Sequence, residues 1–343
     1  MNKVLVTGGT GYIGSHTVVE LINAGYETVI VDNLSNSELF ILDRIEQITG
    51  VKPKFYQIDL CEREKVVELF KAEGNIDAVI HFAAFKAVGE SVKEPLKYFR
   101  NNNLSLINLL EVMSEVNVNN VVFSSSATVY GQPDVLPATE STPFQKALSA
   151  YGSTKQMGEE MLEKVSAATA IKSIALRYFN PVGAHKSALI GELPVGIPNN
   201  LMPFVTQTGI GKREQLTIFG ADYSTPDGTC IRDYIHVVDL AKAHVKACER
   251  LLQGKAEESY EVFNLGTGKG TTVLEIVNAF EKVTGQTLKY KIGERRVGDV
   301  ESLYAETKLA NNKLGWKAEL GLDEMLSSAW AWEVKLHEGI VNA

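Results

Sequence analysis

The stretch "VTGGTGYIGSH", residues 6–16, decides the fold because it joins a strand end, a glycine turn and a helix start. Its glycines Gly8, Gly11 and Gly14 have the spacing G-x-x-G-x-x-G and follow an apolar, β-branched run. Glycine permits a tight turn and lets the backbone approach a pyrophosphate, which then rests on the N-terminus of the following helix. A glycine pattern alone is weak, but here a strand precedes it and a helix follows it. We therefore expect a dinucleotide-binding site at this turn.

An acidic residue follows at the position that selects the dinucleotide. Asp32 ends the next apolar run, residues 27–32, and stands 18 residues after Gly14. A carboxylate there accepts hydrogen bonds from the adenosine ribose and repels a 2′-phosphate, which favours NAD over NADP. No Arg or Lys lies between Asp32 and Arg44 to reverse that preference. Asp59 closes the third apolar run, where we expect it to contact the adenine.

Short apolar runs alternate with helical patterns through the first half of the chain. Apolar strands separated by crossover helices indicate a parallel sheet that is covered on both faces, which is a doubly wound, Rossmann-type α/β fold. The expected strands are residues 3–7, 27–32, 54–59, 78–83, 120–126 and 172–178. The expected helices between them include residues 15–25, 64–74 and 103–117.

The character of the sequence changes after about residue 180. Residues 180–185 and 191–203 are rich in Gly, Pro and Asn and lack periodicity, which is more typical of a binding region than of a plain connector. Helical patterns return at 237–254 and 271–285. We expect an NAD-binding domain over 1–180 and a smaller mixed α/β substrate domain over 181–343, with some later segments returning to the first domain. The loop "GTGKG" at 266–270 could be a second phosphate loop, but no acidic strand end follows it, so a structural turn is favoured.

The composition excludes several classes of protein. The chain has 343 residues, of which 45% are hydrophobic and 22% charged, and a net charge of −8. An acidic chain without Lys/Arg clusters argues against a general nucleic-acid or anionic-membrane surface. Three scattered cysteines imply no disulfide framework, and the absence of zinc-type spacing predicts no metal site. The short apolar run at the N-terminus and the lack of a span-length segment predict a soluble, cytoplasmic protein.

A tyrosine and a lysine share one face of an expected helix. Tyr151 stands four residues before Lys155 in "SAYGSTKQMGEE", residues 149–160. Tyr304 and Lys308 have the same spacing, so the spacing alone identifies no chemistry. Only the first pair follows a strand that ends in serines.

That serine-ended strand gives the first pair a chemical interpretation. A phenol with a pKa near ~10 is a poor base at neutral pH. A neighbouring ammonium and a positively charged nicotinamide ring favour the phenolate and lower its pKa. We expect Tyr151 to be the base, Lys155 to lower its pKa and hold the nicotinamide ribose, and Ser126 to hydrogen-bond the same substrate hydroxyl.

The glycine turn, the serine-ended strand and the Tyr-x-x-x-Lys pair, in this order, resemble the short-chain dehydrogenase/reductase superfamily in its extended form. The blocks "HFAAFKAVGESV", "ALRYFNPVGAH", "GIPNNLMP", "DGTCIRDYIHVVDLA" and "RRVGD" are similar to those of the UDP-glucose 4-epimerase family, and the resemblance covers nearly the whole chain. It implies a reversible exchange of UDP-glucose and UDP-galactose through a 4-keto sugar, with tightly held NAD unchanged after each turnover. It also implies a homodimer formed by the Tyr151 helix and a helix near 93–116.

The resemblance implies two sets of contact residues. Phe219 would pack near the uracil, Arg232 and Arg296 would clamp the pyrophosphate as planar donors, and Asp299 would accept from the uridine ribose. The implied cofactor shell is Gly8, Gly11, Tyr12, Ile13, Gly14, Asp32, Asn33, Asn36, Ser37, Asp59, Leu60, Phe82, Ala83, Ala84, Lys86, Asn101, Ser126, Tyr151, Lys155 and Phe179. The implied substrate shell is Lys86, Ser126, Tyr151, Asn180, Asn200, Leu201, Phe219, Arg232, Arg296, Asp299 and Leu303.

Leu303 bears on the choice of sugar. It stands four residues after the aspartate of "RRVGD", where the family places a residue that borders the sugar pocket. A tyrosine there restricts the pocket to plain hexoses, and a small residue admits N-acetylated sugars. Leucine lies between these cases, so we expect partial tolerance of UDP-N-acetylglucosamine and its galacto epimer.

Three alternatives remain open at this point. A 4,6-dehydratase needs an extra acid and base beside its Ser/Thr, and residues 126–128 read Ser-Ala-Thr with no carboxylate. A UDP-glucuronate 4-epimerase or decarboxylase needs a dedicated cation for the substrate carboxylate, and none is evident. A non-catalytic NAD-binding protein could share the fold, but it would not need both Tyr151 and Lys155.

Overall fold

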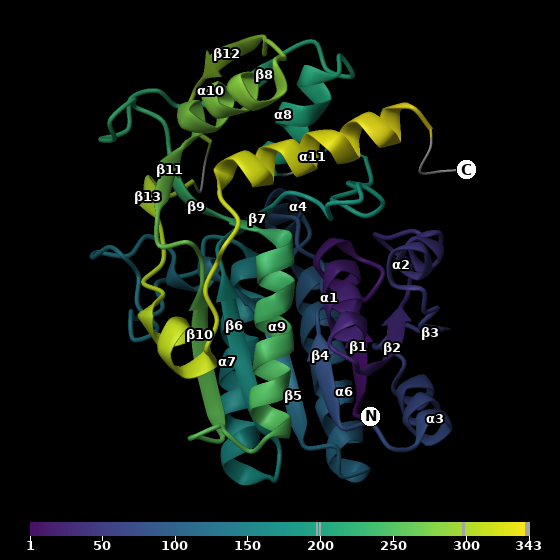
Figure 1. Cartoon of the computed structure of the whole chain (residues 1–343). Coiled ribbons are helices and arrows are strands. Elements are labelled where there is room, and N and C mark those ends of the chain that lie inside the picture. The colour runs from purple at the N-terminus through teal and green to yellow at the C-terminus, as the bar shows by residue number, and fades with distance from the viewer. Residues whose placement is uncertain (197, 199, 297–298, 340–343) are drawn as a thin grey trace.

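The larger lobe of the molecule is built on a seven-stranded parallel sheet (Figure 1). The computed structural model describes residues 1–196, 198, 200–296 and 299–339. The sheet order is β10-β6-β5-β4-β1-β2-β3, so the strand sequence reverses direction at the β1–β4 pair. The strands are β1 (Lys3–Thr7), β2 (Glu27–Asp32), β3 (Lys54–Gln57), β4 (Ala78–His81), β5 (Asn120–Ser126), β6 (Lys172–Tyr178) and β10 (Tyr260–Leu265). The predicted doubly wound α/β fold is confirmed.

Two of the predicted strands end earlier in the structure than in the prediction. β3 ends at Gln57, opposite Asp32 at the end of β2. β4 ends at His81, opposite Thr7 at the end of β1. Each strand thus stops where a neighbouring strand stops. The residues that follow are left to shape the loops at this edge of the sheet.

Helices cover both faces of the sheet, and each face has its own apolar core (Figure 1). One face is packed by α1 (Tyr12–Asn23), α2 (Ile41–Thr49) and α9 (Val237–Leu252). The other is packed by α3 (Arg63–Glu73), α6 (Leu104–Glu115) and α7 (Ala150–Ala168). The short helices α4 (Val88–Lys93) and α5 (Pro95–Tyr98) lead into α6. α1 begins at Tyr12, before the predicted start at residue 15, because Gly11 is already its N-cap.

Two segments from beyond residue 180 belong to this lobe. β10 pairs in parallel with β6, with Tyr260 opposite Ser173, and forms the edge of the main sheet. α9 packs along α1, and residues of both helices belong to the same core cluster. The chain therefore leaves the second lobe and returns to the first.

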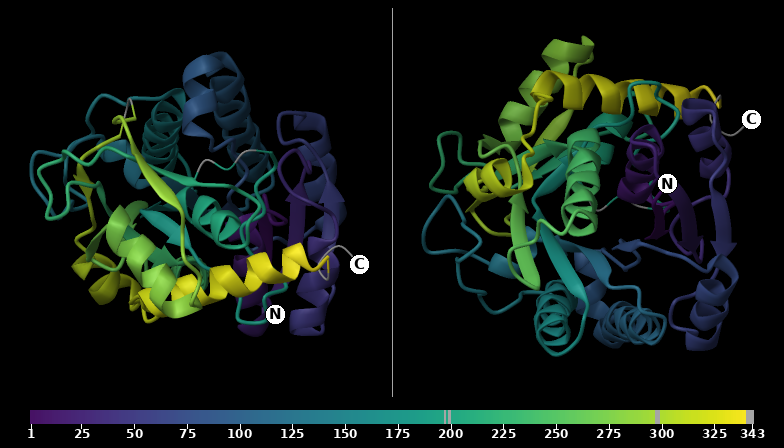
Figure 2. Two further views of the ribbon diagram at one scale, coloured as in Figure 1. Left: turned by 90° about the horizontal axis from the view of Figure 1, so that it is seen from above. Right: turned by 60° about the horizontal axis from the view of Figure 1, so that its bottom comes forward.

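The second lobe lies above the carboxyl ends of the main strands in Figure 1, and Figure 2 shows α11 along this lobe from two further directions. Its four-stranded sheet and its parallel strand pair pack with three helices around a separate core. The strands are β7 (Asn180–Val182), β8 (Leu216–Phe219), β9 (Ile231–His236), β11 (Gly270–Thr272), β12 (Tyr290–Gly293) and β13 (Ser302–Leu303). The helices are α8 (Leu201–Gly209), α10 (Val273–Thr284) and α11 (Leu322–His337).

The glycine-rich loop at 266–270 wraps around a buried carboxylate. Asp233 accepts hydrogen bonds from the backbone amides of Thr267 at 2.8 Å, Gly268 at 3.0 Å and Ala305 at 3.1 Å. The loop amides that could have bound a phosphate are therefore occupied by an internal anion. The loop is a structural turn, as predicted.

The described residues contain neither a membrane-spanning helix nor a cluster of metal-binding side chains. No helix in the described part of the chain is long and apolar enough to cross a membrane. Among the same residues, no group of three or more His, Cys, Asp or Glu side chains could hold a metal ion.

Candidate active site

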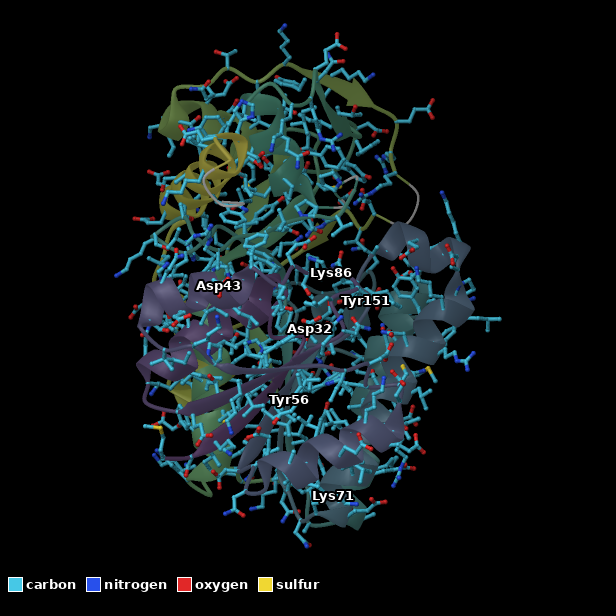
Figure 3. The ribbon with its side chains drawn as sticks, turned by 90° about the vertical axis from the view of Figure 1, so that its right-hand side faces the viewer. Asp32, Asp43, Tyr56, Lys71, Lys86 and Tyr151 are labelled. Atoms are coloured by element: carbon cyan, nitrogen blue, oxygen red, sulfur yellow. The ribbon has the colours of Figure 1, made fainter. Side chains whose placement is uncertain are left out.

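A cavity of about 510 Å³ opens beside the glycine turn, at the carboxyl ends of β1 and β4. This is the point of a doubly wound sheet where ligands bind, because the crossover helices diverge there. Figure 3 shows Asp32, Lys86 and Tyr151 gathered where the two lobes meet. The predicted cofactor residues that line the cavity are Gly8, Gly11, Tyr12, Ile13, Gly14, Asp32, Asn33, Asn36, Ser37, Asp59, Leu60, Phe82, Ala83, Ala84, Lys86, Asn101, Tyr151 and Lys155.

The glycine turn leaves room only for backbone. Gly8 has a φ of +70°, and a Cβ on it would lie 2.9 Å from the backbone nitrogen of Ala83. A Cβ on Gly14 would collide with the carbonyl oxygen of Gly8. Gly11 caps α1 without a side chain, so the first amide groups of the helix face the cavity. This cradle suits an anionic pyrophosphate.

The two acidic strand-end residues are held in fixed orientations. Asp32 accepts from the backbone amide of Leu34 at 2.9 Å and from the Ser37 hydroxyl at 3.1 Å. Asp59 accepts from the Asn33 side-chain amide at 3.3 Å. The two carboxylates thus flank one end of the cavity, where an adenosine would present its ribose hydroxyls and its base.

The Tyr151–Lys155 pair lies on the first turns of α7. The Ser149 hydroxyl caps the helix by accepting from the Gly152 amide at 3.1 Å. Lys155 Nζ lies 5.8 Å from the centroid of the Tyr151 ring and donates to the Ser124 carbonyl at 2.5 Å. The two reactive groups therefore share one face, as the spacing predicted.

Burial controls the protonation of both groups. It raises the pKa of Tyr151 to about 12, and a hydrogen bond with Ser126 only partly opposes this. It lowers the pKa of Lys155 to about 7, against the attraction of Glu159. The sequence predicted that Lys155 and a nicotinamide ring together lower the phenol pKa. Among the protein's own groups desolvation of the phenol outweighs its polar contacts, and the contribution of the ring stays a prediction.

Two predicted cofactor residues do not line the cavity. Ser126, at the end of β5, is buried, and its hydroxyl accepts from the Thr128 amide at 3.2 Å. Phe179 is buried in an apolar cluster with Tyr130 and Leu303. Neither belongs to the lining of the cavity in this structure, although Ser126 bonds with Tyr151, which does.

The residues predicted for the nucleotide of the substrate gather in the second lobe. Asp299 accepts from Arg296 at 2.7 Å and lies 3.9 Å from Arg232. The Arg296 guanidinium lies 5.8 Å from the centroid of the Phe219 ring. Leu303 of β13 stands opposite Arg232 of β9. The structure brings these five residues together, although none of them lines the 510 Å³ cavity.

The remaining substrate candidates are divided between the two places. Asn200 lines the cavity together with Lys86 and Tyr151. Asn180 is exposed at the start of β7, and Leu201 begins α8 with its side chain half-buried. The motif residues 197, 199 and 297–298 lie outside the described part of the chain.

Sequence reasoning missed several residues that line this cavity, among them Ser124, Tyr178 and Glu192. Ser124 accepts from Lys155, and its hydroxyl also bonds with Tyr178. Ser124 stands two residues before Ser126 on one strand, so the alternation of side chains could have identified it. Glu192 bonds with Lys86 and Asn200, and its only signal in the sequence was its place in the irregular segment.

The parallel sheet, the dinucleotide cradle and the Tyr151–Lys155 face define a short-chain dehydrogenase/reductase of the extended form. The family model described as GDP-mannose 4,6 dehydratase matches residues 5–329. A UDP-glucose 4-epimerase of Bacillus subtilis is 54% identical over 99% of both chains, and one of Mus musculus is 50% identical over 97% of both chains. The chain belongs to this extended family, and within it to the UDP-glucose 4-epimerases.

Solved structures agree with this placement. The UDP-glucose-4-epimerase of Stenotrophomonas maltophila, solved with NAD and formylated UDP-arabinopyranose, has a TM-score of 0.95 at 46% identity and covers 99% of this chain and 100% of its own. The enzyme of Bifidobacterium longum, in complex with NAD+ and UDP, has a TM-score of 0.94 at 48% identity and covers 98% of this chain and 100% of its own.

Proposed function

We propose that the protein is an NAD-dependent isomerase that interconverts UDP-glucose and UDP-galactose through a transient 4-keto sugar. The observation that carries this proposal is the buried Tyr151–Lys155 face, which lines the same cavity as the glycine turn. NAD, when bound, supplies a hydride acceptor and donor together with a positively charged ring. The substrate is oxidised and reduced at one carbon, so there is no net redox change.

The residues of the first lobe hold the cofactor and move the proton. The glycine turn and the N-terminus of α1 bind the pyrophosphate, and Asp32 accepts from the adenosine ribose. Tyr151 takes the proton of the sugar 4-hydroxyl as C4 is oxidised and returns it to the same oxygen as C4 is reduced. Lys155 binds the nicotinamide ribose, and Ser126 hydrogen-bonds the reacting hydroxyl. The keto sugar turns between the two steps to present its other face.

The second lobe binds the UDP group. Arg232 and Arg296 supply planar donors for the pyrophosphate, Asp299 accepts from the uridine ribose, and Phe219 packs beside the uracil. Arg296 and Asp299 are paired with each other in this structure, so nucleotide binding exchanges part of that pairing for ligand contacts. On this view residues 1–180 form the NAD-binding domain and residues 181–343 mainly the UDP-sugar-binding domain.

The residues beside Ser126 disfavour the alternative that the protein is a 4,6-dehydratase. Elimination of water needs an acid and a base beside the substrate C5 and C6. The residues that follow Ser126 are Ala127, which is buried, and Thr128, and neither carries a carboxylate. The chain shares the fold of the family model and lacks this part of a dehydratase site.

We infer that two copies associate through α7 and the helices near 93–116, α5 and α6, together with the adjoining α4. Apolar side chains are exposed there, including Val92 at 62%, Leu96 at 80% and Met157 at 44%, which is unusual for a surface that stays in water. We expect a dimer mass by light scattering and a monomer mass for Leu96→Glu. A monomeric wild-type protein would contradict this.

We further propose a cytoplasmic location and no nucleic-acid partner, given the net charge of −8.

The proposed function is tested by turnover without added cofactor. Purified protein is incubated with UDP-galactose alone, and the nucleotide sugars are resolved by chromatography. We expect UDP-glucose to appear, and the same final mixture to form from UDP-glucose. If folded, NAD-loaded protein converts neither sugar, the proposed function is wrong.

A second activity, on UDP-N-acetylglucosamine and UDP-N-acetylgalactosamine, is proposed from Leu303. Its side chain is 7% exposed and packs with Phe179 and Tyr130, and leucine leaves more space than tyrosine would. A solved epimerase of Campylobacter jejuni, with a TM-score of 0.84 and 36% identity, is described as a UDP-Glc/GlcNAc 4-epimerase. We expect Leu303→Tyr to abolish turnover of the N-acetylated pair alone. A wild-type rate ratio below about one in a thousand would contradict partial tolerance, because a methylene-scale clash is worth only ~1–3 kcal/mol.

A further inference from the structure

We propose that Glu192 is a positioning residue that couples the cofactor side of the cavity to its substrate side, because one carboxylate holds both Lys86 and Asn200. This inference rests on the proposed function, since Lys86 is assigned there to the cofactor and the sugar nucleotide and Asn200 to the sugar nucleotide.

The contacts converge on one oxygen atom. Glu192 Oε1 accepts from the Asn200 side-chain amide at 2.6 Å and from Lys86 Nζ at 3.3 Å. The Glu192 side chain is 12% exposed, whereas that of Lys86 is 47% exposed. The carboxylate is thus largely shielded from water, where hydrogen bonds and ion pairs hold more firmly than at an open surface.

The backbone that carries this carboxylate is anchored to α11 of the second lobe. The Glu192 carbonyl accepts from the indole Nε1 of Trp332 at 2.9 Å. Trp332 belongs to α11 and is buried. A Cβ on the preceding Gly191 would lie 2.5 Å from the Trp332 ring, so the backbone is packed directly on the indole. The backbone of Glu192 therefore has an anchor outside the cavity, and its carboxylate extends from there to Lys86 and Asn200.

The two partners of Glu192 come from different lobes of the molecule. Lys86 Nζ lies 5.9 Å from the centroid of the Tyr12 ring, at the glycine turn. The Tyr12 hydroxyl donates to the Gly183 carbonyl at 2.6 Å, at the entry to the second lobe. Asn200 is the N-cap residue of α8. One carboxylate thus links the glycine turn, the loop after β4 and the first helix of the second lobe.

Three substitutions separate positioning from simple packing. Glu192→Gln keeps an oxygen that accepts from Asn200 but loses the charge that holds Lys86. Glu192→Asp keeps the charge but is one methylene too short to reach both partners. Glu192→Ala loses both contacts. If Glu192 positions both groups, the three variants change UDP binding and kcat in different ways. If Glu192 only fills space, UDP binding and kcat fall together, in proportion to the loss of melting temperature.

The test measures UDP binding by calorimetry and steady-state epimerisation on NAD-loaded protein. We expect Glu192→Ala to weaken UDP binding by ~5-fold or more, the value of one lost hydrogen bond, and Glu192→Asp to weaken it by a smaller factor. Glu192→Gln should bind UDP within about 2-fold of wild type and should lower kcat instead. Lys86→Met should lower kcat by a similar factor, and the double variant should show no further loss, because the two residues act as a unit.

The outcomes are distinguishable from those of the proposed function. Wild-type protein that binds no UDP contradicts the proposed function itself. Wild-type protein that binds UDP, with all three Glu192 variants unchanged in UDP binding and kcat, overturns the inference. If Glu192→Ala fails to fold, Glu192→Gln and Glu192→Asp decide whether the inference holds. If these two variants lose UDP binding and kcat equally, in proportion to their loss of stability, the inference is also overturned.

Discussion

At the scale of single residues, the proposed chemistry depends on a phenol that burial makes a weaker acid. Burial raises the pKa of Tyr151 to about 12, so the site needs positive charge to favour the phenolate. Tyr151→Phe removes the group that we propose takes the proton, and we expect kcat to fall by about 10²–10⁴-fold with UDP affinity unchanged. Tyr304→Phe is the matched control, because Tyr304 has the same spacing to a lysine, and it should retain full activity. Comparable losses in both variants would contradict the assignment.

The sequence alone predicted some of the residues of the site but not their contacts or their pKa shifts. Asp32, Tyr151 and Lys155 could be predicted because each stands at a fixed offset from a strand end or a helix start. The direction of the Tyr151 pKa could not, since it depends on how fully the phenol is desolvated. The contact of Glu192 with Lys86 could not be predicted either, because it joins an irregular segment to a residue more than a hundred positions away in the chain.

At the scale of elements, α7 carries the reactive pair on its first turns and a buried ion pair on the next. Glu159, with its side chain 2% exposed, accepts from Arg177 at 2.6 Å and from the Tyr260 hydroxyl at 2.8 Å. These contacts tie α7 to β6 and β10. These contacts therefore hold α7 in place, with Tyr151 and Lys155 facing the cavity.

The ion pair makes α7 sensitive to one substitution. Glu159→Gln leaves the Arg177 guanidinium buried and unpaired, so we expect the free energy of unfolding to fall by about 3–5 kcal/mol. Urea denaturation measures this. Glu163→Gln, on the exposed side of the same helix, is the control and should cost ~0–1 kcal/mol. A loss below about 1 kcal/mol for Glu159→Gln would show that the pair does not support the helix.

Element boundaries were predictable where a strand has neighbours along its whole length. β5 and β6 pair over all of their residues, and both match the prediction, residues 120–126 and 172–178. β3 ends level with β2, and β4 ends level with β1. These ends depend on the pairing in the sheet, so they cannot be predicted from either segment alone. The pairing of β10 with the main sheet likewise could not be predicted from the residues of β10 alone.

At the scale of the whole molecule, buried histidines link stability to pH. Burial lowers the pKa of His16 and of His81 to about 3, and that of His236 and of His244 to about 4. In the unfolded chain each histidine ionises near ~6.5. Below that pH the unfolded state therefore binds more protons, so stability is full above ~6.5 and is lost as the pH falls toward 4.

The expected effect is large. Four such groups give a slope of up to about 5.5 kcal/mol per pH unit, at ~1.4 kcal/mol for each proton. Urea unfolding at pH 7.5, 6.0 and 5.0 measures it, and calorimetry in buffers of different ionisation enthalpy counts the protons taken up. Equal stability at pH 7.5 and 5.0 would contradict the burial of these rings in neutral form.

In the proposed reaction one resident cofactor takes hydride from C4 and returns it to the same carbon. This transfer is tested most directly with UDP-galactose that carries deuterium at C4, incubated with the protein without added NAD and followed by mass spectrometry and NMR. We expect UDP-glucose that retains the deuterium at C4, formed by wild-type and Tyr304→Phe protein but not by Tyr151→Phe protein. Loss of the label to solvent, or UDP-glucose formed as readily by Tyr151→Phe protein, would contradict it.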